Sequence, residues 1–217
     1  MKSMGFNSLD QALAKAQVQK TEASIRRTPI YLIVGLDFGT AYTKCMVRDF
    51  NYRRATPIAF GHNGEESFFL PSELGWANGR LIHALDGIPD GVPVLAFLKM
   101  ALAAAATDVR SDWLDGVVRP IGAADSHKQL DAVRALVVFY LVRVLRVVRD
   151  SIAARWKDFG DVQGDTVFYN MAVPVAQARD EDVLGAFREV LEVAVTIASS
   201  GKEIPQSLAA MIALVEK

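Results

Sequence analysis

The stretch Ile30-Tyr-Leu-Ile-Val-Gly-Leu36, followed by Asp37-Phe-Gly-Thr40, decides the fold. Its first part is an almost continuous apolar run rich in β-branched residues, which is typical of a strand buried on both faces. Asp37-Phe-Gly-Thr40 interrupts this run, and Thr43 to Arg48 again has the composition of a strand. We therefore expect two strands joined by a short glycine-containing turn, which is a β-hairpin.

The rest of the chain alternates between strand and helix signals. Asn78-Gly79 is a strong signal for a hairpin turn. Ser126-His-Lys-Gln129 is a capping box, and apolar residues at helical spacing follow it as far as Ile152. This order predicts a mixed α/β fold, with strands at 56–60, 68–70 and 80–82, helices at 94–107 and 126–152, a strand at 166–173, and helices at 180–201 and 206–216.

Two surface features are expected from local patterns. Residues 1–28 contain the capping box Ser8-Leu-Asp-Gln11 and a thin apolar stripe. They predict a helical N-terminal extension that packs loosely on the rest of the chain or is available to bind a partner. A leader segment that stays in solvent fits the pattern equally well. The arginines of the long central helix are expected on its solvated face rather than in a binding patch; they are Arg134, Arg143, Arg146, Arg149 and Arg155.

Composition excludes several classes of protein. The chain has 217 residues, of which 51% are hydrophobic and 23% charged, with a net charge of −1 and a single cysteine, Cys45. The apolar content suffices for a packed core, and one cysteine excludes a disulfide scaffold. The near-zero charge gives no electrostatic footprint for nucleic acid. The longest candidate membrane segment, Ala135 to Val142, is far shorter than the roughly 20 residues that span a bilayer. With no signal-peptide order either, we expect a cytoplasmic protein without a membrane span.

The turn of the first hairpin carries the most informative chemistry. A glycine at position 39 lets backbone N–H groups approach an anion, and Thr40 adds a hydroxyl donor. Asp37 alone would repel a phosphate, so its presence makes sense if a divalent cation or its water shell lies between them. The pattern therefore indicates a metal–nucleotide site. An ordinary hairpin turn capped by the aspartate is the alternative that these residues leave open.

Four segments in the same order resemble a known family. Asp37-Phe-Gly-Thr-Ala-Tyr-Thr-Lys44 resembles the first phosphate-binding hairpin of the actin, sugar-kinase and heat-shock-chaperone ATPase superfamily. The other three resemble segments of the 70-kilodalton heat-shock chaperones, the most similar branch; they are Leu70 to Ile82, Phe168 to Val175 and Gln206 to Leu214. The resemblance implies a ribonuclease H-like (actin-like ATPase) lobe, in which helices flank a mixed β-sheet and a peripheral subdomain is inserted.

The resemblance also implies a division of the chain. Residues 29–217 would form the first lobe of an actin-like ATPase domain, with a core subdomain at about 29–60 and 160–217. Residues 61–159, approximately, would form the inserted subdomain. The family binds nucleotide between two lobes, and a second phosphate hairpin would begin near Lys217. A single lobe presents half of a cleft, so we expect this chain alone to bind ATP weakly and to hydrolyse it hardly at all.

The resemblance assigns roles around the turn. Asp37 would hold the water shell of Mg²⁺. Gly39, Thr40 and Ala41 would cradle the β- and γ-phosphates through backbone N–H groups and the Thr40 hydroxyl. Tyr42 lies where the family often has a small polar residue, so its role is open.

Three further residues are candidates for phosphoryl-transfer chemistry. Lys44 falls where actin has a phosphate-contacting lysine, and an ordinary surface lysine is its alternative. Lys99 is the only lysine between Lys44 and Lys128, and it could supply the catalytic lysine that chaperones place after the Pro-Ser segment. Gln206 lies where chaperones have a glutamate and actin a glutamine, and it would position metal-bound or attacking water. Lysine beside phosphates offsets the charge that develops in phosphoryl transfer.

The expected function is that of an ATP-binding lobe of a heat-shock-chaperone-like ATPase. It would bind ATP or ADP with Mg²⁺, couple the nucleotide state to lobe closure and act on a protein client or partner. One alternative is an actin-like filament or a division or pilus-type ATPase, which Lys44 and Gln206 favour. The other is a nucleotide-binding pseudo-ATPase scaffold for a protein partner, which the glutamine at 206 favours.

The remaining reactive residues are expected to be structural. The three histidines, His62, His83 and His127, have no cysteine or carboxylate partner at metal-ligand spacing, so each is expected in a loop or at a cap. Cys45 is expected to be a small buried apolar residue rather than a nucleophile.

Overall fold

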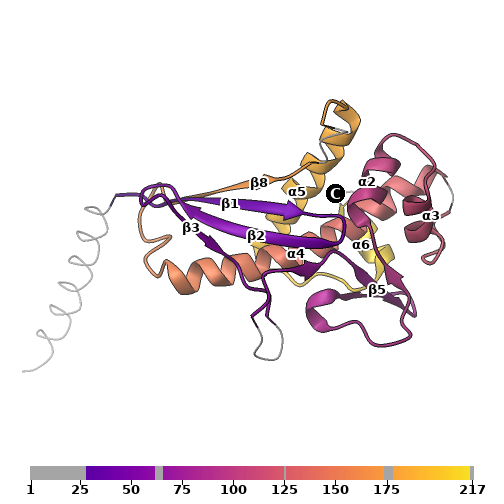
Figure 1. Ribbon diagram of the computed structural model, residues 1–217, viewed down its shortest axis with the longest axis horizontal. Helices are drawn as coiled ribbons and strands as arrows, with labels where there is room; N and C mark the ends of the chain where they lie inside the picture. The colour runs from indigo at the N-terminus through magenta and orange to yellow at the C-terminus, as the bar shows by residue number, and fades with distance from the viewer. Residues whose placement is uncertain (1–27, 62–65, 125, 174–177, 216–217) are drawn as a thin grey trace, which may run out of the picture.

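The expected hairpin is present. In the computed structural model, which describes residues 28–61, 66–124, 126–173 and 178–215, strands β1 (Tyr31–Phe38) and β2 (Tyr42–Asp49) pair antiparallel, with Asp37 opposite Lys44. Strand β3 (Arg54–Pro57) continues the antiparallel arrangement, two residues earlier than expected. The hairpin therefore forms the middle of a sheet, with β3 beside β2 (Figure 1).

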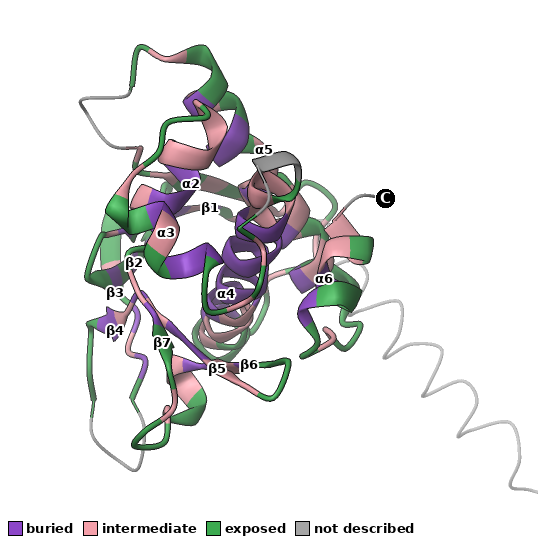
Figure 2. Cartoon of the chain, turned by 90° about the vertical axis from the view of Figure 1, so that its right-hand side faces the viewer, coloured by how far each residue is buried: buried purple, intermediate pink, exposed green. Residues whose placement is uncertain are grey.

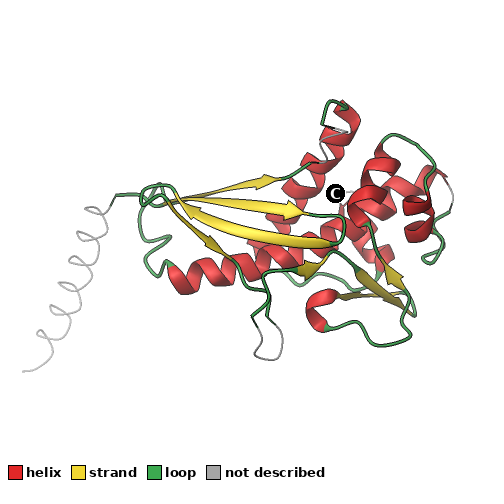
Figure 3. Ribbon diagram, viewed as in Figure 1, coloured by secondary structure: helices red, strands yellow, loops and turns green. Residues whose placement is uncertain are grey.

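A strand far along the chain completes the larger sheet. Strand β8 (Thr166–Met171) pairs parallel with β1, and the order is β3-β2-β1-β8. The short strand β4 (Leu70–Pro71) pairs with the end of β2, which makes the sheet five-stranded. The fold is mixed α/β with a mixed sheet, as the sequence predicts (Figure 3).

Strand β1 is buried on one face only, so the prediction that both faces are buried was wrong. Leu32, Val34, Leu36 and Phe38 are almost fully buried, whereas the alternate positions Gly35 and Asp37 are exposed. Successive side chains of a strand point to opposite faces, so one face carries the core and the other is open within the described residues. An apolar run does not reveal this, because Ile33 and Tyr31 on the open face are also apolar.

Helix α4 (Ser126–Arg155) is the centre of the core. Every residue from 135 to 142 is at most 3% exposed, so the helix is buried on all sides over this part (Figure 2). It packs against α2, α5 and α6, and the ring of its Tyr140 contacts that of Phe38 in β1. Although α4 has 30 residues, no helix among the described residues is apolar enough over a sufficient length to cross a membrane.

Three arginines of α4 connect it to its neighbours, which corrects the expectation of a purely solvated face. Arg134 forms an ion pair with Glu189 at 2.6 Å, Arg143 pairs with Asp86, and Arg146 donates to the carbonyl oxygen of Lys202. These three arginines flank the part of α4 that is buried on all sides, so their polar ends emerge where partners from other elements are available.

A smaller sheet lies beside the larger one. Its order is β6-β5-β7, and its strands are β5 (Leu74–Ala77), β6 (Arg80–His83) and β7 (Val94–Leu95). The Asn78-Gly79 turn joins β5 to β6, so the predicted turn is confirmed, but its first strand is 74–77 rather than 68–70. A short 3-10 helix, η1 (Ala84–Asp86), follows β6.

Two helices near this sheet differ from expectation. Helix α2 (Leu98–Ala106) begins four residues later than expected, because residues 94–95 pair with β5 and Phe97 has a left-handed conformation (φ 58°). Helix α3 (Asp112–Val118) was not expected. Its signal is Ser111, whose hydroxyl accepts from the N–H of Leu114 at 3.2 Å, as in an N-cap.

The C-terminal helices follow their capping signals. Helix α5 (Glu181–Ser200) is capped by Asp180, which accepts from the N–H groups of Asp182 and Val183, and Gly201 ends it in the left-handed conformation. Helix α6 (Leu208–Val215) begins two residues after Gln206 and packs on α4.

Contacts run across the expected division into subdomains, which stays a prediction. The larger sheet combines β1 to β3 with β8, which lie in the two segments assigned to the core. Helix α4, assigned to the inserted part, packs against β2 and carries the ring that contacts Phe38. The N-terminal extension at 1–28 lies outside the described residues except for Thr28.

His83, the last residue of β6, is fully buried against α4. Its ring stacks on that of Tyr140 with centroids 4.8 Å apart, its Nδ1 accepts from the N–H of Leu85 at 3.0 Å, and its Nε2 lies 3.2 Å from the carbonyl oxygen of Tyr140. Since Nδ1 accepts, Nε2 carries the proton and the ring is neutral. Burial and the nearby Arg143 lower the pKa of His83 to about 3. The expectation of a cap is met, because His83 caps η1.

We expect His83 to make stability depend on pH in mild acid. The pKa in the folded state is about 3 and in the unfolded state about 6.5, so the unfolded state binds more protons between these values. Stability should therefore be complete above pH 6.5 and fall by up to about 1.4 kcal/mol per pH unit below it. Urea unfolding at pH 4.5 to 7.5 measures this slope, and His83→Asn, which keeps an acceptor near Nδ1, should flatten it. An equal slope in both proteins would contradict the assignment.

Candidate functional site

The turn between β1 and β2 faces outward. Thr40 and Ala41 are exposed, and within the described residues their N–H groups have no backbone acceptor. The N–H of Gly39 instead donates to the carbonyl oxygen of Tyr42 at 3.1 Å. Two of the three amides expected to cradle a phosphate are therefore available, and the third closes the turn.

Glycine at position 39 is required by the turn itself. A Cβ there would lie 2.3 Å from the carbonyl oxygen of Tyr42, closer than any real contact allows. The close contact that requires glycine at position 39 is therefore a contact within the hairpin itself. Gly35 is different, because a Cβ there would meet nothing nearer than 3.9 Å.

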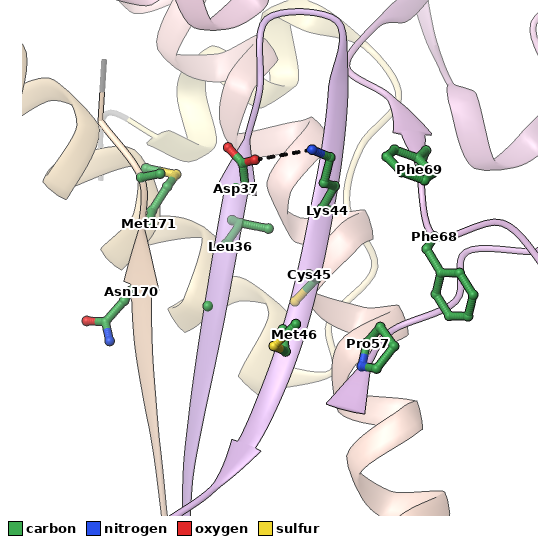
Figure 4. A pocket seen from close by; sticks show the side chains of 12 residues that line it. Leu36, Asp37, Lys44, Cys45, Met46, Pro57, Phe68, Phe69, Asn170 and Met171 are labelled. Carbon is green, nitrogen blue, oxygen red and sulfur yellow. Dashed lines mark ion pairs between the residues drawn. The ribbon is translucent and has the colours of Figure 1, made fainter. Parts of the chain in front are cut away.

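Asp37 and Lys44 face each other on the open face of the sheet. The antiparallel register makes them direct partners, and both side chains are about half exposed. Their nearest charged atoms, Lys44 Nζ and Asp37 Oδ2, are 3.8 Å apart (Figure 4). This separation is an ion pair but exceeds the length of a hydrogen bond. The Lys44 ammonium therefore remains able to bind another anion.

Lys99 is buried close to the same carboxylate. It is the second residue of α2 and is only 8% exposed. Burial lowers the pKa of its ammonium, and the negative charge of Asp37 acts in the opposite direction. Within the described residues, Lys99 makes no hydrogen bond or ion pair. Because partial burial disfavours the charged form of Lys99, an anion bound beside its ammonium would favour that form again.

A pocket of about 600 Å³ extends from Asp37 and Lys44 along the open face of the sheet (Figure 4). Its floor includes Gly35, and Asn170 is the remaining polar side chain of its lining. The other walls are apolar or sulfur-containing; they include Met46, Pro57, Phe68, Phe69 and Met171. A mostly apolar pocket with a few polar groups at one end has the character of a small-molecule site.

Gln206 is engaged elsewhere. Its side-chain oxygen accepts from the guanidinium of Arg80, and its carbonyl oxygen accepts from the N–H of Leu81 at 2.8 Å. It does not line the pocket that contains Asp37 and Lys44. The structure thus pairs Lys44 with Asp37 in the pocket and ties Gln206 to β6. Lys99 lies within the electrostatic influence of Asp37 but does not line the pocket.

Sequence reasoning missed the contribution of the segment around β4. The hydroxyls of Thr43 and Ser72 are buried and 2.8 Å apart, and the N–H of Ser72 donates to the carbonyl oxygen of Ala41 at 2.9 Å. These bonds hold the second half of the turn. The sequence singles out Pro71-Ser72 only through the family resemblance. No local sequence pattern predicts that this segment pairs with β2.

The other reactive residues have structural settings. Cys45 is 5% exposed, and burial raises the pKa of its thiol to about 12, so it is an inert apolar side chain as expected. His62 and the side chain of His127 lie outside the described residues. No group of three or more His, Cys, Asp or Glu residues that could hold a metal occurs in the described part of the chain.

Comparisons with known proteins add no further constraint: no family model, curated protein or solved structure matches this chain.

The two glycines of the hairpin should respond in opposite ways to alanine. Gly39→Ala places a Cβ against a backbone carbonyl, so the free energy of unfolding should fall by about 1–3 kcal/mol. Gly35→Ala has room and an ordinary strand conformation, so stability should be unchanged or rise by about 0.4–1 kcal/mol. Denaturant unfolding compares the two variants, and equal losses would show that the turn can relax.

Proposed function

We propose that this chain is the phosphate-binding lobe of a heat-shock-chaperone-like ATPase, with ATP or ADP as its ligand. The observation that carries the proposal is Lys99, a residue only 8% exposed whose ammonium makes no hydrogen bond or ion pair among the described residues and lies within the electrostatic influence of Asp37 at the end of β1. Lys44 approaches the same carboxylate from β2 at 3.8 Å. Two lysines around one aspartate leave a net positive charge beside a turn with two open N–H groups, which suits a polyphosphate.

The finer fold assignment is part of this proposal. A ribonuclease H-like lobe needs a mixed sheet built from an early hairpin and a strand that returns after an insertion. The parallel pairing of β8 with β1, across the intervening residues 58–165, supports that assignment. The candidate residues Asp37, Thr40 and Ala41 all lie at the end of the central strand or in its turn.

Magnesium is compatible with this set of donors in one way. Asp37 is a single, half-exposed carboxylate, and Mg²⁺ commonly uses one or two carboxylates together with waters and substrate phosphates. Asp37 would hold the water shell of the ion. When bound, Mg²⁺ supplies charge neutralisation for the phosphates.

Lysine side chains and backbone N–H groups would each contribute to binding the phosphates. Lys99 would offer the terminal phosphates a positive charge from α2, and Lys44 would offer one from β2. Thr40 and Ala41 would donate their N–H groups, and the Thr40 hydroxyl would add a donor. Closure of a second lobe over these groups would exclude water and strengthen each contact.

The position of Gln206 favours a second candidate, a nucleotide-binding pseudo-ATPase scaffold. Its side-chain oxygen already accepts from Arg80, so it is not free to orient an attacking water. Such a protein would bind nucleotide and respond to it without appreciable hydrolysis.

Replacement of Lys99 tests the proposed site. Lys99→Met keeps the length of the side chain and removes its charge, so affinity for MgATP should fall by roughly ten- to a hundredfold. The Lys99 ammonium makes no hydrogen bond or ion pair among the described residues, so the midpoint of thermal unfolding should not fall. Calorimetric titration and thermal unfolding measure both effects, with Lys157→Met, an exposed lysine, as the control. Unchanged affinity in Lys99→Met, or no binding by the unaltered chain at millimolar MgATP, would refute the proposal.

Nucleotide binding should also be linked to protons. Burial lowers the pKa of Lys99 in the free protein, and a bound anion should raise it again. Proton uptake should therefore accompany binding at alkaline pH, and affinity should fall as pH rises through a range below the ordinary lysine value of 10.5. Titration calorimetry in buffers of different ionisation enthalpy measures the uptake, which Lys99→Met should abolish. Uptake that persists in this variant would assign the proton to another group.

A further inference from the structure

Asp37, Lys44 and Phe69 form one row across the open face of the larger sheet. Lys44 is the register partner of Asp37 in β1. On its other side, β2 pairs with β4 through Tyr42 with Pro71 and Thr43 with Leu70, so Phe69 continues the same register opposite Lys44. Lys44 therefore has a carboxylate on one side and an aromatic ring on the other (Figure 4).

The ring lies within range of the ammonium. Lys44 Nζ is 5.4 Å from the centroid of the Phe69 ring, which is the geometry of a cation–π contact. The edge of the Tyr42 ring packs against Phe69, with centroids 6.3 Å apart and planes at 85°. Ser67 holds the backbone, since its hydroxyl donates to the carbonyl oxygen of Phe69 at 2.8 Å.

Phe69 restrains Lys44 without neutralising it. A lysine side chain loses considerable rotamer freedom when it is fixed, and its 3.8 Å separation from Asp37 is too long to fix it alone. The ring supplies the second restraint and leaves the charge of the ammonium available. Both Phe69 and Tyr42 are more than half exposed, and the restraint on Lys44 accounts for two aromatic rings at the surface.

We propose that Phe69, braced by Tyr42, is a positioning residue for Lys44 that holds the ammonium ready for a ligand phosphate. This inference rests on the proposed phosphate-binding function. It also gives Tyr42, whose role the sequence left open, a place in the site. The binding energy comes from Lys44, and the aromatic pair reduces the entropy lost when Lys44 meets the anion.

Affinity for inorganic tripolyphosphate tests the inference without a nucleobase. Phe69→Leu should weaken binding by roughly two- to fivefold, and Phe69→Tyr should retain it. Phe168→Leu is the matched control, because Phe168 has nearly the same exposure, lies on the same sheet face and is outside the pocket lining. In a Lys44→Met background, Phe69→Leu should have no further effect. No loss in Phe69→Leu, or an equal loss in both backgrounds, would overturn the positioning role.

A second measurement separates this inference from the proposed function. The ring of Phe69 should shift the ε-methylene proton resonance of Lys44 upfield in NMR spectra of the full chain, with Lys44→Met identifying the signal. Phe69→Leu should remove the shift and Phe168→Leu should keep it. If the unaltered chain binds no tripolyphosphate, the proposed function fails while this shift still shows whether the ring restrains Lys44. Absence of the shift in the unaltered chain would overturn the inference itself.

Discussion

The buried ring of Tyr140 joins the parts of the molecule on which the site depends. It lies 5.6 Å from the ring of Phe38 in β1 and 4.8 Å from that of His83 in β6, and its hydroxyl donates to the carbonyl oxygen of Pro71 in β4 at 3.1 Å. One side chain of α4 thus contacts two strands of the larger sheet and one strand of the smaller sheet. Burial raises the pKa of the Tyr140 hydroxyl, so it stays protonated and remains a donor.

The inward packing of β1 determines what faces outward. Phe38 and Leu36 are buried against the helices, so Asp37 between them must point to the open face. A slip of one residue in the register would exchange the two faces and bury the carboxylate. The same alternation in β2 buries Thr43 and Cys45 and exposes Lys44. The charged pair is therefore a consequence of core packing, and the hairpin turn is held above it by the bonds from Ser72.

Features with local signals could be predicted, and features set by distant pairing could not. The hairpin, the Asn78-Gly79 turn and the caps of α5 depend on neighbouring residues, and all are present. The apolar run of β1 was taken as buried on both faces because a sequence does not show how many layers cover a sheet. The proximity of Lys99 to Asp37 depends on where α2 packs, and the contact of Phe69 with Lys44 depends on the pairing of β4 with β2. Sequence reasoning made Lys99 a candidate only through a family resemblance and did not propose the contact of Phe69 with Lys44.

The setting of Cys45 makes the chain convenient for spectroscopic labelling. It is the single cysteine, it is 5% exposed, and at neutral pH it holds almost no thiolate, the form that reacts with maleimides and iodoacetamides. A cysteine introduced on the surface would therefore take a dye or spin probe alone, with the native thiol left in place.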